Sequence, residues 1–373
     1  MTAHVWGVGT SSFGRQPSLS APQLAETAVR EALGDAGLTG IDAVFAGTVF
    51  GAPGTAQRAL SSMGITGVPI VTIENACATG STALHEARWA IESGRYGTVL
   101  CLGIETMTAH FAGPITPEST DSEGRSGMAL PAVYASVASR YAALHGLADI
   151  DLAAVAVKNR RHGSLNDRAQ HGRTVTADEV LASRMVADPL TLLQCCDLSD
   201  AAAAAILGPR RRTSRDIPLR ATALLSGHLW DHRSVQPWGY ELVRDTARMA
   251  YDAAGIGPED ADLVELHDAF TIGELVTSEA LGITGEGKAA SLLHEGHTSL
   301  GGAQPINPSG GLLSRGHPLG ATGLAQVAEA VWQLRGDCGA RQVDGADVAV
   351  VETMGGGTAG IDGNGCVVAV LGG

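Results

Sequence analysis

The sequence predicts an α/β protein in which a layered sheet is covered by helices, built as two similar halves. Short apolar, β-rich runs alternate with runs that carry apolar residues at helical spacing, which is the pattern of layered α/β folds. Strand-to-helix turns follow both Ile73 and Leu266, so the second half repeats the rhythm of the first. At 373 residues, with 45% hydrophobic residues and 49 glycines, the chain is long enough for two compact halves with tight turns.

The first half begins with strands and helices that the residue pattern justifies in turn. Residues 4–9 form a short apolar strand. The run 21–37 is predicted to be a helix, because Leu24, Ala28 and Ala32 share one face and glycine ends it. The same reasoning gives a strand at 41–50, a loop with a short helix at 51–67, a buried strand at 70–73, a helix at 85–91 and a strand at 98–104.

Residues 106–196 depart from this alternation and are predicted to form a loop domain inserted in the N-terminal half. The segment opens with a loop rich in Pro, Ser and Gly at 113–127. Two helical runs follow at 131–146 and 150–161, and then a polar segment at 162–168. We therefore expect this segment to lie on one end of the sheet.

The second half resumes the alternation after a very apolar, Ala-rich strand. The predicted strands are 200–207, 219–225, 263–266, 348–352 and 365–371, and the predicted helices are 240–255, 270–281 and 318–334. The predicted organisation is an N-terminal half at 1–105, the loop domain at 106–196, a final strand and linker of that half at 197–215, and a C-terminal half at 216–373.

Composition excludes several classes of function. The net charge of −14 and the absence of a long basic run argue against a nucleic-acid partner. No apolar run approaches the roughly 18 residues of a membrane span. The six cysteines form no Cys-x-x-Cys pair and no zinc-like spacing with histidine, so no metal site is predicted. With no signal peptide in view, we expect a reducing, cytoplasmic location.

Cys77 is the first candidate catalytic residue, because it lies where a strand turns into a helix. Backbone N–H groups and the positive end of the helix dipole point at the sulfur there, which predicts a stabilised thiolate. Small neighbours, among them Ala76, Ala78 and Gly80, leave room for an acyl group. A lone cysteine is more often a buried structural thiol, so the case for a nucleophile depends on the rest of the chain.

Three further stretches contain Gly, Pro or His at positions where strands or helices are predicted to end or begin. In one, His267 follows a strand; in another, Asn307 begins Asn-Pro-Ser-Gly-Gly, and His317 stands between a glycine and Pro318. Proline suits the first helical position, and it leaves the preceding residue, His317, with little torsional freedom. The third is the glycine run 355–357, which can present N–H groups to an oxyanion. Alone, each has a structural explanation: a core histidine or a turn between strands.

Together the four stretches resemble the thiolase family. The closer match is to its sterol-carrier-protein and lipid-transfer-type branch and to the related archaeal-type thiolases. The motifs are Cys-x-Thr-Gly-Ser-Thr-Ala from Cys77, His-Asp-x-Phe from His267, Asn-Pro-Ser-Gly-Gly from Asn307, Gly-His-Pro-Leu-Gly-Ala-Thr-Gly from Gly316 and the terminal glycine run. The resemblance implies a thiolase fold: two βαβαβαββ halves in a five-layered αβαβα core, with a loop domain.

The resemblance also implies an acyl-CoA C-acyltransferase that works through an acyl-enzyme on Cys77. His317 would be the base that keeps Cys77 as thiolate. The N–H groups of Cys77 and Gly355 would form an oxyanion hole, and His267 with His317 would hold the oxygen of a developing enolate. Gly356 and Asn307 would support these groups. The coenzyme A thioester is the expected substrate, and no further cofactor is expected.

Two positions depart from the family pattern. Thiolases usually carry a second cysteine as acid and base, but its two usual positions hold Ala269 and Thr353 here. The remaining Cys-His-His set also resembles ketoacyl synthases, so decarboxylative or non-decarboxylative acyl transfer is an alternative. A retro-aldolase acting on a side-chain acyl-CoA and a non-catalytic thiolase-like subunit are further alternatives. Relatives of those two kinds tend to lose catalytic residues that this chain keeps.

The predicted loop domain carries a cluster of cations in an acidic chain. The cluster includes Lys158, Arg160, Arg161, Arg168 and Arg173, with His162 among them. It is either a patch for a phosphorylated ligand or a solvated helix end. Arg160, Arg161 and His162 are the candidates for binding coenzyme A.

The resemblance finally implies partners. It predicts a homodimer or tetramer. Members with His-Asp-Ala-Phe often work beside a small zinc-ribbon/OB-fold protein that helps to bind acyl-CoA, and the scarcity of cations here agrees with a need for that help.

Overall fold

The computed structural model describes residues 2–115, 122–230, 233–356 and 360–373, so Gly357 of the predicted glycine run lies outside the described residues. Nine strands form one sheet in the order β3-β2-β4-β7-β1-β8-β11-β10-β9. The first five belong to the N-terminal half: β1 (His4–Thr10), β2 (Ala43–Gly47), β3 (Ile70–Ile73), β4 (Val99–Thr106) and β7 (Asp200–Gly208). The other four belong to the C-terminal half: β8 (Ile217–Leu225), β9 (Leu263–Glu265), β10 (Val348–Gly355) and β11 (Gly365–Gly372). The two halves of the sheet join where His4 and Val5 of β1 pair with Pro218 and Ile217 of β8.

The helices and the two sets of strands stack in five layers, as expected from the sequence. The N-terminal strands are covered on their outer face by α1 (Ala21–Ala36) and α2 (Thr55–Ser62). Between the two sets of strands lie α3 (Thr79–Glu92) and α12 (Leu319–Arg335), and their apolar residues contact both sets. The outer face of the C-terminal strands is covered by α8 (Tyr240–Ala254) and α9 (Thr271–Ala280). The αβαβα order of the core is therefore confirmed.

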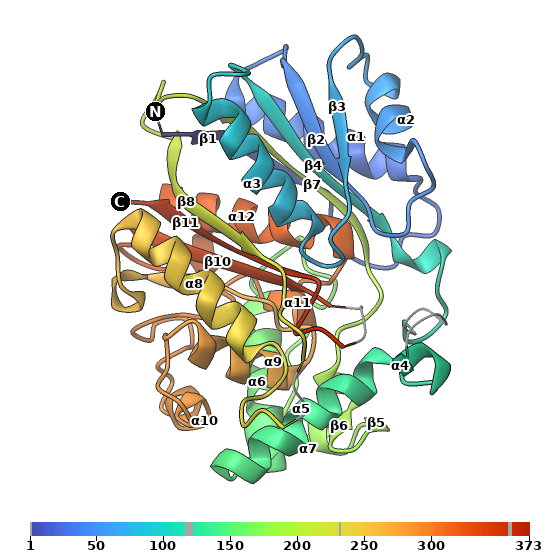
Figure 1. Ribbon diagram of the computed structural model, residues 1–373, viewed down its shortest axis with the longest axis vertical. Helices are drawn as coiled ribbons and strands as arrows, with labels where there is room; N and C mark the ends of the chain where they lie inside the picture. The colour runs from blue at the N-terminus through green and yellow to red at the C-terminus, as the bar shows by residue number, and fades with distance from the viewer. Residues whose placement is uncertain (1, 116–121, 231–232, 357–359) are drawn as a thin grey trace.

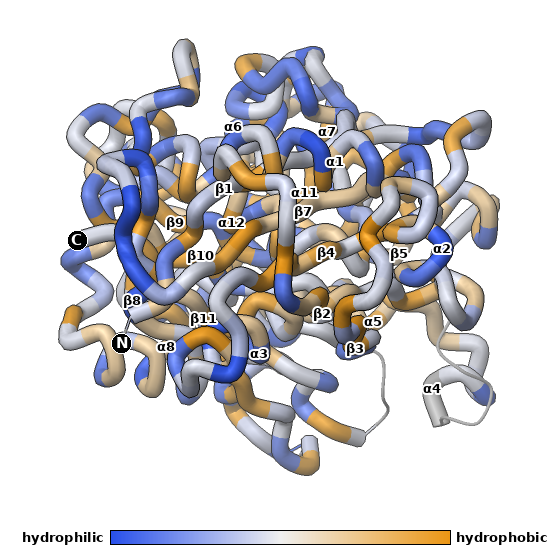
Figure 2. Tube along the Cα trace, turned by 90° about the horizontal axis from the view of Figure 1, so that it is seen from above, coloured by the Kyte–Doolittle hydropathy of each residue, from blue (hydrophilic) through white to orange (hydrophobic). Residues whose placement is uncertain are grey.

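Strand β7 shows why these residues form a central strand. Ala202, Ala204 and Ile206 face α1, whereas Ala201 and Ala203 face the central helices. Alternate side chains point to opposite faces of a strand, and both faces are covered here, so the whole run is apolar. In Figure 2 the apolar stretches accordingly lie along strands in the middle of the molecule.

Glycine contacts bring the start of α12 against the first half. A Cβ at Gly103 of β4 would lie 2.3 Å from the carbonyl oxygen of Gly320, and one at Gly323 would lie 2.6 Å from the amide nitrogen of Ser81 in α3. Since no Cβ tolerates such distances, these positions require glycine. Backbone contact therefore places the start of α12 against β4 and against the start of α3.

The described residues of the segment 107–199, which are 107–115 and 122–199, pack below the core in Figure 1, and α5 and α6 contact α9. They contain α4 (Ser122–Arg125), α5 (Leu130–His145), α6 (Asp149–Gly163), α7 (Ala177–Leu181) and the small pair β5 (Met185–Ala187) and β6 (Leu190–Thr191). Two further short helices, α10 (Ala289–His294) and α11 (Gly311–Ser314), lie in the C-terminal half. Among the helices in the described ranges, none has the length and apolar character that crossing a membrane requires.

Two local expectations were wrong. Strand β3 was expected to be buried, but it is the edge of the sheet, and Val71 is 46% exposed. Pro318 was expected at the first helical position, but it is the N-cap of α12, with extended backbone, and the helix begins at Leu319. The ring of Pro318 still fixes the backbone directly after His317.

Candidate active site

Cys77 lies in a tight turn between β3 and α3. Ala76 has a φ of 48°, a left-handed conformation that is uncommon outside glycine, so the turn is strained. Thr79 holds the turn from within: its hydroxyl donates to the carbonyl oxygen of Ala76 at 2.6 Å and accepts the amide of Asn75 at 2.8 Å. The sulfur is thereby presented two residues before the helix begins, where the sequence predicted it.

Burial raises the pKa of the Cys77 thiol to about 12. Hydrogen bonds from the amides of Gly356 and Cys77 itself act in the opposite direction, but burial outweighs them. Burial thus opposes the stabilised thiolate that the sequence predicted, because a helix start is visible in the sequence and a dry pocket is not. The thiol needs a base to react at neutral pH.

His317 is placed to be that base. Its Nδ1 lies 2.8 Å from the hydroxyl oxygen of Thr322, and that hydroxyl donates to the carbonyl oxygen of Pro318 at 3.0 Å. Since the hydroxyl proton is already used, the ring must donate from Nδ1, which leaves Nε2 unprotonated. Burial, with His267 and Arg315 nearby, lowers the pKa of His317 well below its usual value. The ring is therefore a neutral base.

His267 completes a compact group with these two residues. One ring nitrogen of each histidine and Cys77 Sγ all lie within 4.8 Å of one another, and the two rings meet edge-on with centroids 5.0 Å apart. Burial lowers the pKa of His267 to about 4, and its Nε2 is buried without a hydrogen-bond partner among the described residues. An unpaired polar atom that lines a cavity is available to a bound substrate. A Cys-His-His group of this size can also ligate a metal ion, which spacing along the chain does not reveal.

The glycine that contacts the sulfur is one residue later than the sequence indicated. Gly356, which was predicted only to support the site, directs its amide to Cys77 and lines the cavity. Gly355, predicted for the oxyanion hole, is the last residue of β10 and pairs with Gly365 of β11. The strand pairing runs further than the sequence suggests and moves the free amide to Gly356.

The three side chains open into one cavity of about 250 Å³. Its walls are mostly apolar, and they come from both halves and from the segment 107–199. They include Met107, Ile115, Leu130, Tyr134, Trp238 and Phe270. Tyr134 stacks on Phe270 with ring centroids 4.3 Å apart, which gives a flat apolar wall. Such a cavity excludes water and suits an acyl chain.

The predicted basic cluster is not one patch. His162 is buried, donates from Nδ1 to the carbonyl oxygen of Asn307 at 3.0 Å and accepts the amide of Leu300 at Nε2. Burial lowers its pKa to about 3, so the His162 ring is structural and offers no charge to a phosphate. Lys158 is also buried, 3.0 Å from Glu274. Arg160 is buried and Arg161 exposed at the end of α6, and their role toward coenzyme A stays a prediction.

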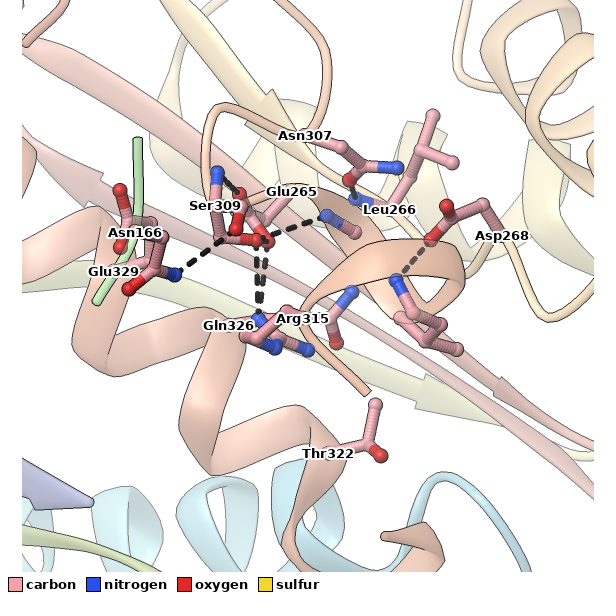
Figure 3. Close-up of polar contacts among 12 residues, drawn as sticks. Asn166, Glu265, Leu266, Asp268, Asn307, Ser309, Arg315, Thr322, Gln326 and Glu329 are labelled. Carbon is pink, nitrogen blue, oxygen red and sulfur yellow. Dashed lines mark hydrogen bonds and ion pairs between the residues drawn. The ribbon is translucent and has the colours of Figure 1, made fainter. Parts of the chain in front are cut away.

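A buried polar network supports the loop that carries His317 (Figure 3). Arg315 lies 3.2 Å from Glu265 at the end of β9, and Ser309 donates to Glu265 at 2.8 Å. Asn307, predicted as a supporting residue, has a left-handed φ of 54° and accepts the amide of Leu266 at 2.9 Å. The network thus fixes both the segment before His267 and the segment before His317.

Sequence reasoning missed three groups near the reactive atoms. Glu352 on β10 accepts the amide of His267 at 2.9 Å, so it fixes that residue's backbone. Cys195 and Cys196 line the cavity beside Cys77. The pair was visible in the sequence as adjacent cysteines, but nothing in the spacing indicated which cavity they reach.

The thiol of the free enzyme should react with iodoacetamide slowly at pH 7 and about tenfold faster for each unit of pH up to about pH 10, because the thiolate is the nucleophile and the thiol pKa is raised. Mass spectrometry of the Cys77 peptide after timed alkylation measures this. A rate that is flat below pH 8 would instead indicate a stable thiolate–imidazolium pair with His317.

Comparison with known proteins agrees with this geometry. Residues 7–211 match the thiolase N-terminal domain, and residues 228–361 match the thiolase C-terminal domain-like family. Human sterol carrier protein 2 is 39% identical over 378 residues, covering 94% of this chain and 69% of that protein. The acetyl-CoA acetyltransferase of Methanothermobacter thermautotrophicus is 38% identical over 367 residues, covering 94% of this chain and 96% of that enzyme.

A solved structure of the Ltp2-ChsH2(DUF35) aldolase shares the fold, with a TM-score of 0.86 and 24% identity over 100% of this chain and 97% of that chain. At that identity the likeness concerns the fold. With both halves matched and two relatives aligned along nearly its whole length, this chain belongs to the thiolase family.

Proposed function

We propose that the chain is an acyl-CoA C-acyltransferase that forms or cleaves a carbon–carbon bond through an acyl-enzyme on Cys77. The observation that carries this is the convergence of one thiol and two neutral imidazoles within 4.8 Å in an apolar cavity. A relative that is 38% identical is an acetyl-CoA acetyltransferase, which supports the same chemistry. The substrate is a coenzyme A thioester.

The first half-reaction uses Cys77, His317 and Gly356. His317 Nε2 takes the thiol proton as the sulfur attacks the thioester carbonyl. The amides of Cys77 and Gly356 already point to the sulfur, so they are placed to stabilise the oxyanion of the tetrahedral intermediate. The carbon–sulfur bond to coenzyme A then breaks, and the acyl group stays on Cys77.

The second half-reaction needs donors for an enolate oxygen. His267 Nε2 has no partner among the described residues, and His317 Nε2 carries a proton once Cys77 has reacted. Both rings are placed to hold the thioester oxygen of the second substrate as negative charge develops on it. The same groups would serve carbon–carbon cleavage in the reverse direction.

Retro-aldol cleavage of a side-chain acyl-CoA is the second candidate function, and the fold shared with an aldolase favours it. It needs no nucleophile, whereas acyl transfer requires Cys77. Incubation with acetyl-CoA and with acetoacetyl-CoA, followed by intact mass spectrometry, distinguishes the two. We expect an acyl adduct on Cys77 that is absent from Cys77→Ala. Aldol cleavage of a 3-hydroxyacyl-CoA without any adduct would establish the second candidate instead.

The proposal includes a homodimer. Strand β3 is an edge of the sheet, and edge strands with apolar side chains pair readily with another copy. Val71 on β3 is 46% exposed, and Trp89 on the neighbouring α3 is 55% exposed. Such large exposed apolar side chains near an open edge support pairing of two copies there.

Val71→Arg should shift the protein to monomers at micromolar concentration, because a charge would be buried at the paired edge. Sedimentation velocity measures the change. Met249→Arg is the matched control, since Met249 is 48% exposed but lies on α8, away from this edge. A Val71→Arg protein that sediments like the wild type would place the interface elsewhere.

A partner protein also belongs to the proposal. The aldolase that shares this fold was solved as an Ltp2-ChsH2(DUF35) assembly, which supports an assembly of this chain with a second protein. We propose a small zinc-ribbon/OB-fold protein that helps to bind acyl-CoA, with Arg160 and Arg161 on this chain contributing to phosphate binding. A reducing, cytoplasmic location is also proposed for this chain, because its own six cysteines are free thiols.

A further inference from the structure

Carbon–carbon chemistry next to a thioester needs a proton carrier that the groups described so far do not supply. Cys77 holds the acyl group while the second substrate reacts, so it cannot exchange a proton with Cα. His267 and His317 are used at the thioester oxygen. A further acid and base must therefore face the cavity.

We propose that Cys196 is this proton carrier, giving and taking the proton at Cα of the second substrate. The inference rests on the proposed acyl-transfer function. Cys196 lines the same cavity as Cys77, His267 and His317. Among the described residues, the cysteines that line this cavity are Cys77, Cys195 and Cys196.

Backbone contacts fix Cys196 beside the catalytic histidine loop. Its amide donates to the carbonyl oxygen of Ala269 at 2.9 Å, two residues after His267. The backbone of Cys195 forms an antiparallel β-bridge with that of Phe270. Residues 195–196 therefore lie beside residues 269–270. Ala269 also lines the cavity, and its short side chain leaves room there for the neighbouring thiol.

Of the two adjacent cysteines, Cys195 has a sulfur that is already engaged in a hydrogen bond. Cys195 Sγ donates to the carbonyl oxygen of Thr191 at 3.3 Å, so this thiol is turned toward its own loop. Burial is the largest cause that raises the pKa of Cys196 well above the usual value, and the neighbouring acidic groups Cys195, Cys77 and Asp268 add to it. A thiol that stays protonated in the resting site can act first as an acid.

Other polar groups near the site are less suited to this role. Thr353 is buried, and its hydroxyl donates to Gln326 at 2.6 Å. Asp197 lines the cavity but lies 3.1 Å from His171, an ion pair when that ring is protonated, and 3.6 Å from Arg15. Burial raises the pKa of Tyr134 well above its usual value, so its phenol is a poor partner for reversible proton transfer.

In the cleavage direction the step balances as follows. Cys77 thiolate adds to the 3-keto carbonyl, and the carbon–carbon bond breaks with its electron pair on the acetyl-CoA enolate. Cys196 S–H gives its proton to Cα of that enolate. The Cys196 thiolate then takes the proton of the incoming coenzyme A thiol, whose sulfur attacks the acyl group and releases Cys77. Condensation is the reverse sequence.

Two half-reactions separate Cys196 from Cys77. Acylation by acetyl-CoA, measured by intact mass, depends on Cys77 and its base, because coenzyme A can leave as a thiolate and take up the Cys196 proton afterwards. Loss of deuterium from the methyl group of trideuteroacetyl-CoA to water needs the proton carrier at Cα. For Cys196→Ala we expect acylation within about threefold of the wild type and deuterium loss slowed about 10²–10⁴-fold, the usual range for a general acid–base group.

Cys101→Ala is the matched control, because Cys101 is a buried thiol on β4 that does not line the cavity. Cys196→Ser keeps the shape of the site if Cys196→Ala fails to fold, and it should show the same selective loss. Deuterium loss within threefold of the wild type in either folded variant overturns the proposal. A wild-type enzyme that is never acylated would instead overturn the proposed function.

Discussion

Replacing His317 with glutamine should slow acylation of Cys77 by about 10²–10⁴-fold, the range for loss of a general base. The reason is the raised pKa of the Cys77 thiol, about 12, which leaves almost no thiolate at pH 7 without a base in contact. Pre-steady-state acylation with acetyl-CoA, followed by rapid-quench mass spectrometry, measures the rate.

The pH dependence distinguishes a lost base from a damaged fold. In His317→Gln the remaining rate should rise about tenfold for each pH unit, because hydroxide then supplies the thiolate. His294→Gln is the control: His294 is 44% exposed, does not line the cavity, and lies 2.8 Å from Asp151 in the first turn of α6. A His317→Gln enzyme within tenfold of wild type at pH 7 would assign the base to another residue.

Replacing Arg315 with methionine should lower the free energy of unfolding by about 3 kcal/mol, because it leaves Glu265 buried without its cation. The two side chains are 2% and 0% exposed, and burial already raises the pKa of Glu265 to about 7. We expect the lower end of the usual range, since Arg315 Nε and Nη2 lack partners among the described residues. Urea denaturation measures the change.

A double variant and an exposed pair make this test specific. Arg315→Met with Glu265→Leu should recover much of the loss, since removing both members of a buried pair is often nearly neutral. Arg30→Met should cost less than about 0.5 kcal/mol, because Arg30 and its partner Glu26 are 65% and 42% exposed. If Arg315→Met costs no more than Arg30→Met, the Arg315–Glu265 pair does not hold the loop.

The sequence predicted the elements of the core well because their signals are local. Apolar periodicity and flanking glycine placed every strand of the sheet, and β3 was misjudged only in its burial, since an edge and a centre look alike in four residues. The four motifs predicted the reactive group because each lies at a loop whose shape Gly or Pro restricts. These are properties of short stretches.

What the sequence could not supply depends on contacts between distant segments. The pKa of Cys77 follows from walls contributed by three parts of the chain. The place of Gly356 follows from the length of the β10–β11 pairing. His162 appeared basic and exposed because its partners, Asn307 and Leu300, lie more than a hundred residues away. Cys196 reaches the site through Ala269, a contact that no spacing encodes.

The backbone contact between Gly103 and Gly320 has a consequence for engineering. Part of the approach of the base to the nucleophile is set where main chain touches main chain, in addition to the side-chain network around Arg315. Leu130 lines the acyl cavity away from these glycine contacts and is the position to vary, whereas Trp238 packs against Gly356. The glycines themselves cannot be replaced, because any Cβ there would clash with the facing main chain.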